Sequence, residues 1–261
     1  MYPVLFQLGP ISVESFWVML FLGFFVALQV VRAEFRRLDY DPSWAYDFIL
    51  YAYVGGLIGA RLFLLTSAWD VFVQDPFEFL FSGSGWVWQG GVMGGALAVW
   101  LGCWHKGLPI AVAADVAAPA MAIGQAIGRI GCQLSGDGDY GVPTTLPWAM
   151  SYPHGTVPTE QLVHPAPIYE MLLYGAIFWL LWRLRHRGYR PGILAGVYFV
   201  TTGAARFVVE FVRINRVIAL GLTLPQLLSI GSCLLGLALC ARPWTASAST
   251  ARHTAVATHN S

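Results

Sequence analysis

The sequence has little charge for its length. Only 11% of its 261 residues are Asp, Glu, Lys or Arg, and the formal net charge is +1. A soluble domain carries about 25% charged residues, so this chain has too little polar surface to cover a water-soluble globule of its size. The balanced net charge also provides no basic footprint for a polyanion. These shortages exclude a cytosolic enzyme, a disordered tail protein and a nucleic-acid-binding protein.

Cysteine is also scarce. The four cysteines are Cys103, Cys132, Cys233 and Cys240, and they lie within or at the edge of apolar stretches. Their spacing fits neither a disulfide framework nor a zinc site. The sequence therefore predicts no metal site and no cofactor.

Apolar residues, at 57% of the chain, are what the sequence has in excess. A membrane-spanning helix needs about 20 mostly apolar residues, and seven stretches meet this requirement. They lie near 13–32, 45–66, 87–105, 109–131, 167–184, 192–212 and 217–240. The expected fold is an all-α integral membrane protein with about seven transmembrane helices.

Three segments need separate treatment. The stretch 109–131 carries Asp115 and Pro119, so it either spans the membrane or forms a re-entrant or broken helix facing the protein interior. The stretch 67–86 is too short and acidic to span, and its aromatic residues suit a segment lying at the interface. The first apolar stretch is expected to stay in the mature protein, because it lacks a positive n-region and a small-residue cleavage site.

The positions of Lys and Arg predict the orientation. Ten of these residues follow the first, third, fifth and seventh stretches, whereas two, Arg213 and Arg216, lie in the alternate connections. This bias places the N-terminus and the loop 132–166 outside and the C-terminus in the cytoplasm. Residues 1–242 are expected to form the membrane domain, and the polar residues 243–261 a disordered cytoplasmic tail.

Some charges fall where lipid should be. Three cations lie inside or at the edge of apolar stretches, namely Arg61, Arg129 and Arg206. An Arg at mid-bilayer costs roughly 2.5–3.5 kcal/mol on insertion scales, so it normally faces a protein interior or wet cavity, paired or bound to an anion. The intramembrane anions are Glu14, Asp47, Asp115, Glu170 and Glu210. One interpretation is that they pair with the arginines and specify packing, Arg61 with Asp47 or Asp115.

A second interpretation is a bound anion. Residues 124–141 read GQAIGRIGCQLSGDGDYG, which predicts an interfacial glycine-rich turn around Arg129. Glycines let the backbone approach a ligand and expose N–H groups, and a guanidinium matches phosphate oxygens in bidentate fashion. The turn is therefore a candidate site for a headgroup phosphate. Its candidate binding residues are Gly128, Arg129, Gly131, Ser135, Gly136 and Asp137.

The sixth stretch carries a matching set of charges. In GAARFVVEFVR (203–213), Arg206, Glu210 and Arg213 follow one another at spacings of four and three, which places them on one helical face. Such a face is unfavourable on an apolar helix unless it lines a polar cavity. Together with Arg129, it predicts that an amphiphilic anion, most simply a phospholipid, is handled at the outer leaflet.

Further polar residues are expected at the same membrane level. Gln89 opens the third stretch, His164 precedes the fifth, and Glu170 begins the fifth. A histidine at a membrane edge is either an interfacial hydrogen-bonding residue or a base. Whether His164 lies near Glu170 depends on how the segment Pro165–Pro167 bends.

Together these residues resemble the prolipoprotein diacylglyceryl transferases of bacterial inner membranes, over most of the chain from about Gly9 to about Gly236. The motifs, in the family's order, are GARL (59–62), WQGGVMGG (88–95), Asp115 with Ala117-Ala118-Pro119, GRIGCQLSGDGDYG (128–141), HPAPIYE (164–170), GAARFVVEFVR (203–213) and LTLPQLLSIG (222–231). The resemblance implies the family's seven-helix bundle, with a periplasmic head formed largely by 132–166.

The resemblance also implies an activity. In this family the diacylglyceryl group of phosphatidylglycerol is transferred to the lipobox cysteine thiol of a preprolipoprotein, forming a thioether and releasing glycerol 1-phosphate. Arg129 and Arg206 match the family's phosphate-binding arginines, and Glu210 and Arg213 match the acidic and basic residues that follow. The implied partners are phosphatidylglycerol, membrane lipid and the signal peptide of the preprolipoprotein, at the inner membrane and without nucleic acid.

The chain departs from the family's pattern at proton-handling and hydrogen-bonding positions. Gln89 stands where the family's HGG motif has a histidine proposed as the base. In GRxGNFxNGE, Cys132 and Ser135 replace the two asparagines and Asp137 shortens the glutamate. The main expectation is an active transferase in which His164, Asp137 or water takes the proton. Two alternatives stay open: an enzyme with another acceptor or lipid donor, and a non-catalytic phospholipid-binding membrane protein.

Overall fold

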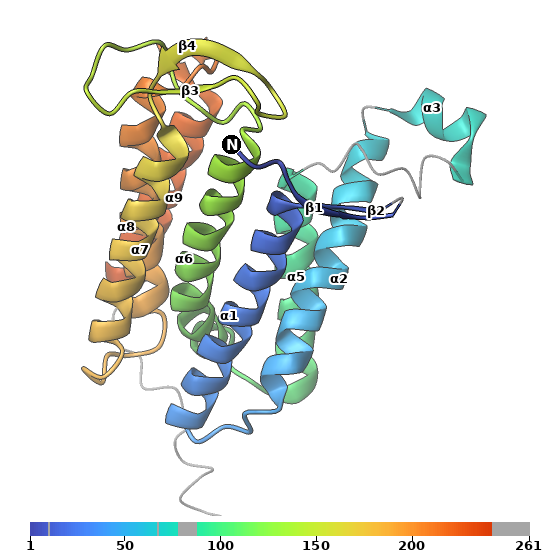
Figure 1. Cartoon of the computed structure of the whole chain (residues 1–261). Coiled ribbons are helices and arrows are strands. Elements are labelled where there is room, and N and C mark those ends of the chain that lie inside the picture. Colours follow the sequence, from blue (N-terminus) through green and yellow to red (C-terminus); the bar gives the residue numbers. More distant parts are fainter. Residues whose placement is uncertain (10, 67, 78–87, 242–261) are drawn as a thin grey trace, which may run out of the picture.

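The computed structural model describes residues 1–9, 11–66, 68–77 and 88–241 (Figure 1). Each of the predicted apolar stretches contains one long helix. The long helices in this part of the chain are α1 (Ser15–Arg37), α2 (Trp44–Leu65), α5 (Trp88–Lys106), α6 (Ile110–Ser135), α7 (Ala166–Leu184), α8 (Ile193–Val209) and α9 (Leu224–Ala241). The prediction of an all-α fold is confirmed.

Helix α6 lies at the centre of the bundle (Figure 1). It packs against α1 on one side and against α7 and α8 on the other, while α2 pairs with α5 and α8 pairs with α9. Its buried face is made of small side chains, which let neighbouring helices approach closely. They include Ala113, Ala118, Ala122, Ala126 and Gly131. Helix α6 runs without a break through Pro119, so the alternative of a broken helix at 109–131 is wrong.

An aspartate fixes α8 against α6. The Asp115 carboxylate accepts hydrogen bonds from the backbone N–H groups of Gly192 (2.7 Å) and Ala195 (2.8 Å) at the start of α8. The first N–H groups of a helix lack intrahelical partners, and negative charge is favourable there. Asp47 lies 2.7 Å from Lys106 instead. The two carboxylates considered as partners of Arg61 are thus engaged elsewhere.

Glycines set the contact between α2 and α5. A Cβ placed on Gly94 would lie 2.7 Å from the Cα of Gly59, and one placed on Gly55 would lie 2.6 Å from the carbonyl oxygen of Gly94. No side chain fits at such distances, so these backbones touch directly, as small residues permit in membrane helices. The glycines of the GARL and WQGGVMGG motifs therefore act in helix packing.

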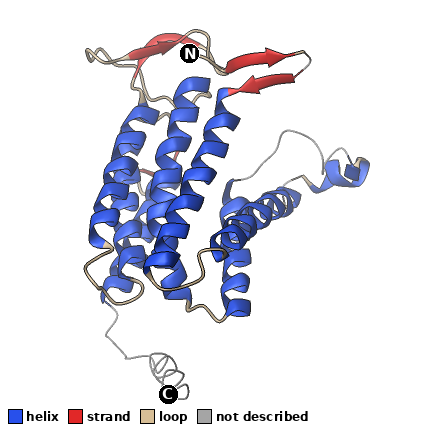
Figure 2. Ribbon diagram, turned by 60° about the horizontal axis from the view of Figure 1, so that its bottom comes forward, coloured by secondary structure: helices blue, strands red, loops and turns tan. Residues whose placement is uncertain are grey.

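Small antiparallel hairpins lie at the head end of the bundle. Within the described ranges, β1 (Val4–Leu8) pairs with β2 (Ile11–Glu14), β3 (Met150–Tyr152) with β4 (Thr159–Val163), and β5 (Val217–Ala219) with β6 (Leu222–Thr223). Residues 136–165, which contain β3 and β4, form a head over the ends of α6, α7 and α8 (Figures 1 and 2).

The predicted start of the last span differs from the structure. The expected last span began at 217, but 217–223 forms the β5–β6 hairpin and α9 begins at Leu224. Leu220 and Gly221 have positive φ at the turn, as a two-residue hairpin loop requires. In the predicted interfacial segment, α3 (Trp69–Gln74) stands beside the end of α2, away from the bundle (Figure 1). Residues 78–87 and the expected tail 243–261 lie outside the described residues.

The expectation of a glycine-rich turn around Arg129 is wrong. Helix α6 continues to Ser135, and the chain first turns at Gly136, whose φ is +58°. Alternating small and apolar side chains with no proline after Pro119 sustain the helix, and the left-handed Gly136 ends it in the usual way. The backbone N–H groups around Arg129 are therefore used by the helix and are not free for a ligand.

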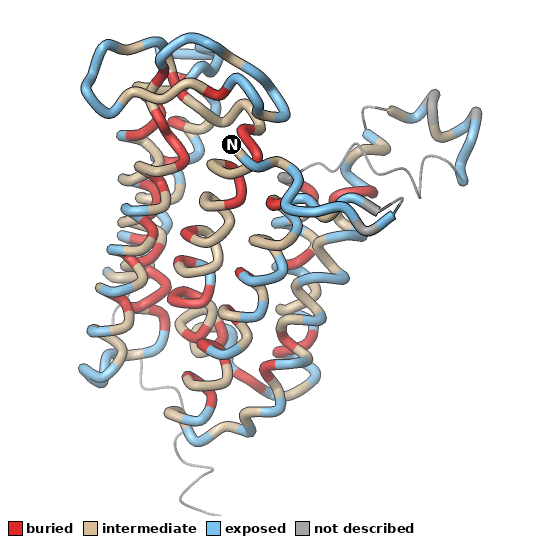
Figure 3. Tube along the Cα trace, in the orientation of Figure 1, coloured by how far each residue is buried: buried red, intermediate tan, exposed pale blue. Residues whose placement is uncertain are grey.

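The outer faces of the helices are apolar and exposed (Figure 3). Among the described residues, five helical segments are long and apolar enough to cross a membrane, namely α1, α2, α6, α8 extended to Val212, and α9. In soluble proteins such faces are covered. The fold is that of a multi-pass membrane protein.

Candidate functional site

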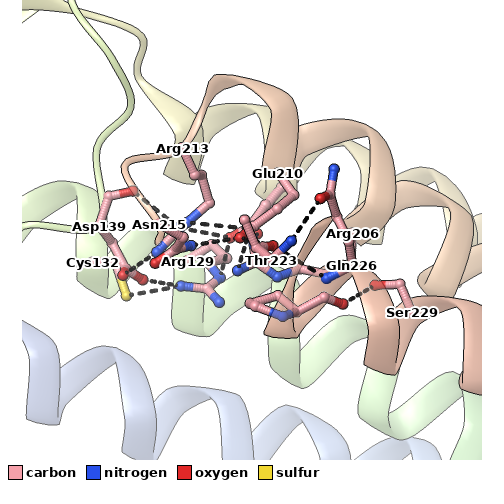
Figure 4. A network of polar contacts seen from close by, with 12 residues as sticks. Arg129, Cys132, Asp139, Arg206, Glu210, Arg213, Asn215, Thr223, Gln226 and Ser229 are labelled. Atoms are coloured by element: carbon pink, nitrogen blue, oxygen red, sulfur yellow. Dashed lines mark hydrogen bonds and ion pairs between the residues drawn. The ribbon is translucent and has the colours of Figure 1, made fainter. Parts of the chain in front are cut away.

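A polar network lies under the head, where α6 and α8 end and α7 begins (Figure 4). Among the described residues it joins three arginines and three carboxylates, namely Arg129, Arg206, Arg213, Asp139, Glu170 and Glu210. Figure 4 shows the three arginine side chains pointing toward a common centre. Arg129 comes from α6, whereas Arg206 and Arg213 come from the end of α8 and the residues after it, so the fold brings Arg129 to the other two.

Glu170 joins the two arginines that the sequence singled out. This residue lies near the start of α7 with its carboxylate buried. Its Oε2 lies 2.6 Å from Nε of Arg129, and its Oε1 lies 2.7 Å from Nη1 of Arg206. The expected convergence of Arg129 and Arg206 is thus present, on a shared carboxylate. Two guanidinium groups at this separation also suit the oxygens of a phosphate.

Asp139 joins Arg129 to the third arginine. Its Oδ2 pairs with Nη1 of Arg129, its Oδ1 lies 2.5 Å from Nη2 of Arg213, and its backbone carbonyl accepts a hydrogen bond from Nη1 of Arg213 at 3.0 Å. Burial by itself would raise the pKa of Asp139, but the two guanidinium groups outweigh it and hold that pKa below its usual value. Asp139 is therefore an anion that two cations share.

Glu210 holds the network to the last helix. Its Oε2 lies 2.8 Å from Nη2 of Arg206, and its Oε1 accepts hydrogen bonds from the Asn215 amide and the Thr223 hydroxyl, each at 2.7 Å. Thr223 in turn donates its backbone N–H to Gln226 at the start of α9. Glu210 is thus a buried carboxylate with several partners, which fixes the position of Arg206.

The expected helical face of Arg206, Glu210 and Arg213 is present only in part. Helix α8 ends at Val209, residues Glu210–Val212 form a 3-10 turn, and Arg213 is extended with φ −94° and ψ 158°. The three side chains nevertheless meet, because the tighter turn brings Arg213 Nε to 4.0 Å from the Glu210 carboxylate. Spacing predicted the contact correctly although the local structure differs.

Burial strengthens the attraction between the charges of this network. The side chains of Glu170 and Glu210 are 1% and 0% exposed, whereas those of Arg129 and Arg206 keep 25% and 21%. Charges act on each other more strongly in such surroundings than in water. The formal charges of the three arginines and three carboxylates cancel. The arginine side chains thus stay partly exposed, whereas the carboxylates of Glu170 and Glu210 are buried.

The other residues of the predicted turn have packing contacts. A Cβ on Gly131 would lie 3.1 Å from the Met19 side chain of α1, whereas one on Gly128 would meet open space. Ser135 is buried and its carbonyl accepts a hydrogen bond from Thr156, while Gly136 lies against Gly155. Ser135 and Gly136 thus anchor the head to α6, whereas Gly131 packs against α1.

Asp137 and Cys132 lie beside the network. Asp137 follows the end of α6, and burial raises its pKa. Cys132 Sγ lies 3.6 Å from Nη1 of Arg129. Ligand atoms of Cys132, Asp137 and Asp139 lie within 4.8 Å of one another, but the pairing of Asp139 with two guanidinium groups leaves this group unsuited to a metal cation. The sequence prediction of no metal site stays a prediction.

Among the described residues, His164 contacts Tyr169 rather than Glu170. Its Nδ1 lies 3.2 Å from the Tyr169 hydroxyl, which accepts a hydrogen bond from the Trp148 indole at 2.7 Å. The Tyr169 hydroxyl thus links the His164 ring to the Trp148 indole. Gln89 lies in the first turn of α5, with its side chain outside the described part of the structure, and Arg61 is buried in α2.

The sequence analysis missed Asp139 and the residues that support Glu210. Asp139 lies in the quoted motif GDGDYG, and its charge two residues after Asp137 was the available signal. Asn215, Thr223 and Gln226 gave no signal, because polar residues after a span are usual in any connection. Their role depends on the β5–β6 hairpin, which the hydropathy of 217–240 concealed.

Comparisons with known proteins agree over nearly the whole chain. A family model described as prolipoprotein diacylglyceryl transferase matches residues 3–242. The chain is 32% identical over 251 residues to the phosphatidylglycerol–prolipoprotein diacylglyceryl transferase of Methylococcus capsulatus, covering 92% of this chain and 94% of that protein. The corresponding values are 32% over 246 residues for the protein of that name from Chromohalobacter salexigens (91% of each chain) and 31% over 236 residues for that from Leptospira interrogans (80% and 73%). The chain therefore belongs to the prolipoprotein diacylglyceryl transferase family.

Proposed function

We propose that this protein transfers the diacylglyceryl group of phosphatidylglycerol to the lipobox cysteine thiol of a preprolipoprotein, at the polar network under the head. Family membership supports the reaction class, and its curated relatives carry the same activity in their names. The single observation that carries the assignment of the site is the meeting of Arg129, Arg206 and Arg213 in one buried network at the head end of the bundle.

The reaction is a displacement at the glyceryl carbon that bears the phosphate. The thiolate sulfur forms a bond to this carbon, and the carbon–oxygen bond to the phosphate breaks. Glycerol 1-phosphate leaves with the bonding electron pair, so negative charge grows on the phosphate oxygens during the reaction. Donors placed to meet that charge lower the barrier. The guanidinium groups of Arg129 and Arg206 would act in this way, with Arg213 beside them.

The buried carboxylates would position these arginines. Glu170 holds Arg129 and Arg206 at the separation of two oxygens of one group, and Glu210 holds Arg206 from the other side. A fixed guanidinium loses little freedom when it binds an anion, and its planar fork keeps the donors aligned. The same arrangement in a site with little water strengthens each contact with the phosphate.

The acceptor thiol must lose a proton. An unperturbed thiol has a pKa of about 8.5, and neighbouring guanidinium groups lower it. Gln89 cannot accept the proton, because an amide is not basic near neutral pH. Nδ1 of His164 lies 3.2 Å from the Tyr169 hydroxyl and is engaged by it. Asp137, which lies beside the network, would be the proton acceptor, since burial raises its pKa and makes it a stronger base.

The proposed topology has seven spans, with the head in the periplasm and the C-terminus in the cytoplasm of a bacterial inner membrane. The end of the bundle opposite the head carries most of the cations (Figure 1), as the positive-inside rule requires of the cytoplasmic side. They are Arg32, Arg36, Arg37, Lys106, Arg183, Arg185, Arg187 and Arg190. Residues 1–242 would form the membrane domain and 243–261 a cytoplasmic tail.

Expression in a bacterial strain depleted of its own transferase tests the proposal. The chain should restore the transfer of labelled lipid from phosphatidylglycerol to a lipobox cysteine. Arg129→Lys and Arg206→Lys should each reduce transfer by about 10²–10³-fold, as removal of one oxyanion donor does in other enzymes. The variants must be present in the membrane at the amount of the original chain. A folded chain that transfers no lipid to a lipobox peptide would contradict the proposed function.

A further inference from the structure

The charge balance of the network restricts how a phosphate can enter it. Arg129, Arg206 and Arg213 are already matched by Asp139, Glu170 and Glu210. A lipid phosphodiester brings one more negative charge into a site where charges are poorly screened. An unbalanced charge in such surroundings is unfavourable by several kcal/mol. Entry of the phosphate is therefore favourable when one carboxylate gives up its arginines.

Of these three carboxylates, Asp139 is the one that can leave. Glu170 and Glu210 belong to helical turns and their side chains are at most 1% exposed, whereas the Asp139 side chain lies in a loop and is 31% exposed. Glu210 also accepts two neutral hydrogen bonds, whereas the side-chain partners of the Asp139 carboxylate are the two guanidinium groups. Moving Asp139 toward water therefore exposes no further buried polar group.

The loop around Asp139 is short and is anchored at both ends by backbone hydrogen bonds. Gly136 at its start is fixed by Val157, and Gly141 and Val142 at its end are fixed by His164 and Val212. Between these anchors, Gly138 has φ +91°, a conformation that glycine adopts and leaves at little cost. Tyr140 stacks on the Tyr152 ring and donates to the Val157 carbonyl, so a change of conformation that leaves the head attached would fall on 137–139.

We propose that the Asp139 carboxylate and the donor phosphate compete for the guanidinium groups of Arg129 and Arg213, so that Asp139 leaves them when phosphatidylglycerol binds. This inference rests on the proposed function. The two oxygens of the Asp139 carboxylate each pair with one guanidinium group. Two phosphate oxygens would take their places, and the single negative charge of the phosphodiester would replace that of the carboxylate. Asp139 thereby sets the affinity for the donor, and a neutral lipid gains nothing from its departure.

The test measures binding of fluorescent phosphatidylglycerol to the purified full chain in neutral detergent. Asp139→Asn keeps the size of the side chain and removes the competing charge, so the dissociation constant should fall about tenfold, a typical value for a charged hydrogen-bonding partner. Glu160→Gln is the matched control, because Glu160 is an exposed carboxylate on β4 of the head. It should bind the lipid as the original chain does.

The outcomes separate competition from a positioning role. If Asp139 instead holds the arginines in place for the lipid, Asp139→Asn will bind phosphatidylglycerol equally or more weakly, and the inference is overturned. Fluorescent diacylglycerol, which has no phosphate, should bind both chains alike, and an equal gain for this lipid would also overturn it. Tighter binding without transfer to a lipobox peptide by either chain would contradict the proposed function and leave the competition standing.

A second measurement uses the original chain, in case Asp139→Asn does not fold. Hydrogen–deuterium exchange is followed across the head with and without saturating phosphatidylglycerol. The Asp139 backbone N–H donates to the Asp137 side chain at 3.2 Å, so departure of Asp139 should accelerate exchange at 138–140 while the amides of Gly141 and Val142 stay protected. Exchange at 138–140 that is unchanged or slower at saturation would refute the displacement.

Discussion

The charge of Glu170 should be a large contributor to the stability of this protein. Glu170→Gln keeps the shape of the side chain but leaves Arg129 and Arg206 facing an uncharged amide across 2.6 and 2.7 Å. Removing one partner of a buried ion pair costs about 3–5 kcal/mol. Because both arginines are about one quarter exposed and keep Asp139 and Glu210 as partners, we expect the lower limit, about 3 kcal/mol.

The measurement is the free energy of unfolding of the full chain in detergent micelles, taken without added lipid. Glu160→Gln removes an equal charge from the exposed face of the head and should change the free energy of unfolding by less than about 0.5 kcal/mol. A loss below about 1 kcal/mol for Glu170→Gln, within the range of a surface pair, would refute the assignment of Glu170 as a buried bridge between two helices.

Further expectations concern packing, helix ends and acid. Asp115→Ala removes the cap of α8 and should lower the free energy of unfolding by about 1–2 kcal/mol, measured by thermal unfolding in detergent. Gly94→Ala places a Cβ against the Gly55 carbonyl oxygen and 2.7 Å from the Cα of Gly59, and it should destabilise by about 1–3 kcal/mol, while Gly231→Ala on α9, where nothing lies within 4 Å, should be tolerated. The lowered pKa of Asp139 gives stability that is full above about pH 4 and is lost as the pH falls toward that pKa. Asp139→Asn should therefore unfold with less acid sensitivity below about pH 4 than the original chain, and equal sensitivity would show that the two guanidinium contacts are absent in solution.

Hydropathy alone located the long helices, because an apolar run of about 20 residues has few alternatives in a membrane. It failed at 217–223, where Val217 and Ile218 are as apolar in a hairpin as in a helix and the hairpin is marked by the positive φ of Leu220 and Gly221. Whether all seven stretches span also stays a prediction, since α5 and α7 are not among the five described helices that qualify by length and composition.

The charged residues of the site that lie in apolar stretches were predictable, because a charge is unfavourable in lipid. Arg129 and Arg206 stood out because an arginine in an apolar stretch needs a partner, and the structure supplies Glu170 to both. The surroundings of Arg129 were not predictable from its glycines, which are compatible with a turn and with close helix packing alike. Asp139 was missed because a carboxylate in a polar loop is ordinary until the fold brings Arg213 to it.

The hydrogen bonds between Asp115 and the start of α8 fix the height of α8 relative to α6. Arg129 follows Asp115 by 14 residues along α6, and Arg206 follows Gly192 by 14 residues in and just before α8. Both helices run from these hydrogen bonds toward the head, and 14 residues of helix rise about 21 Å. The two guanidinium groups consequently arrive at one height, and a slip of a single turn at the far end would separate them by about 5 Å. Asp115, which is remote from the site, thus fixes the relative heights of Arg129 and Arg206.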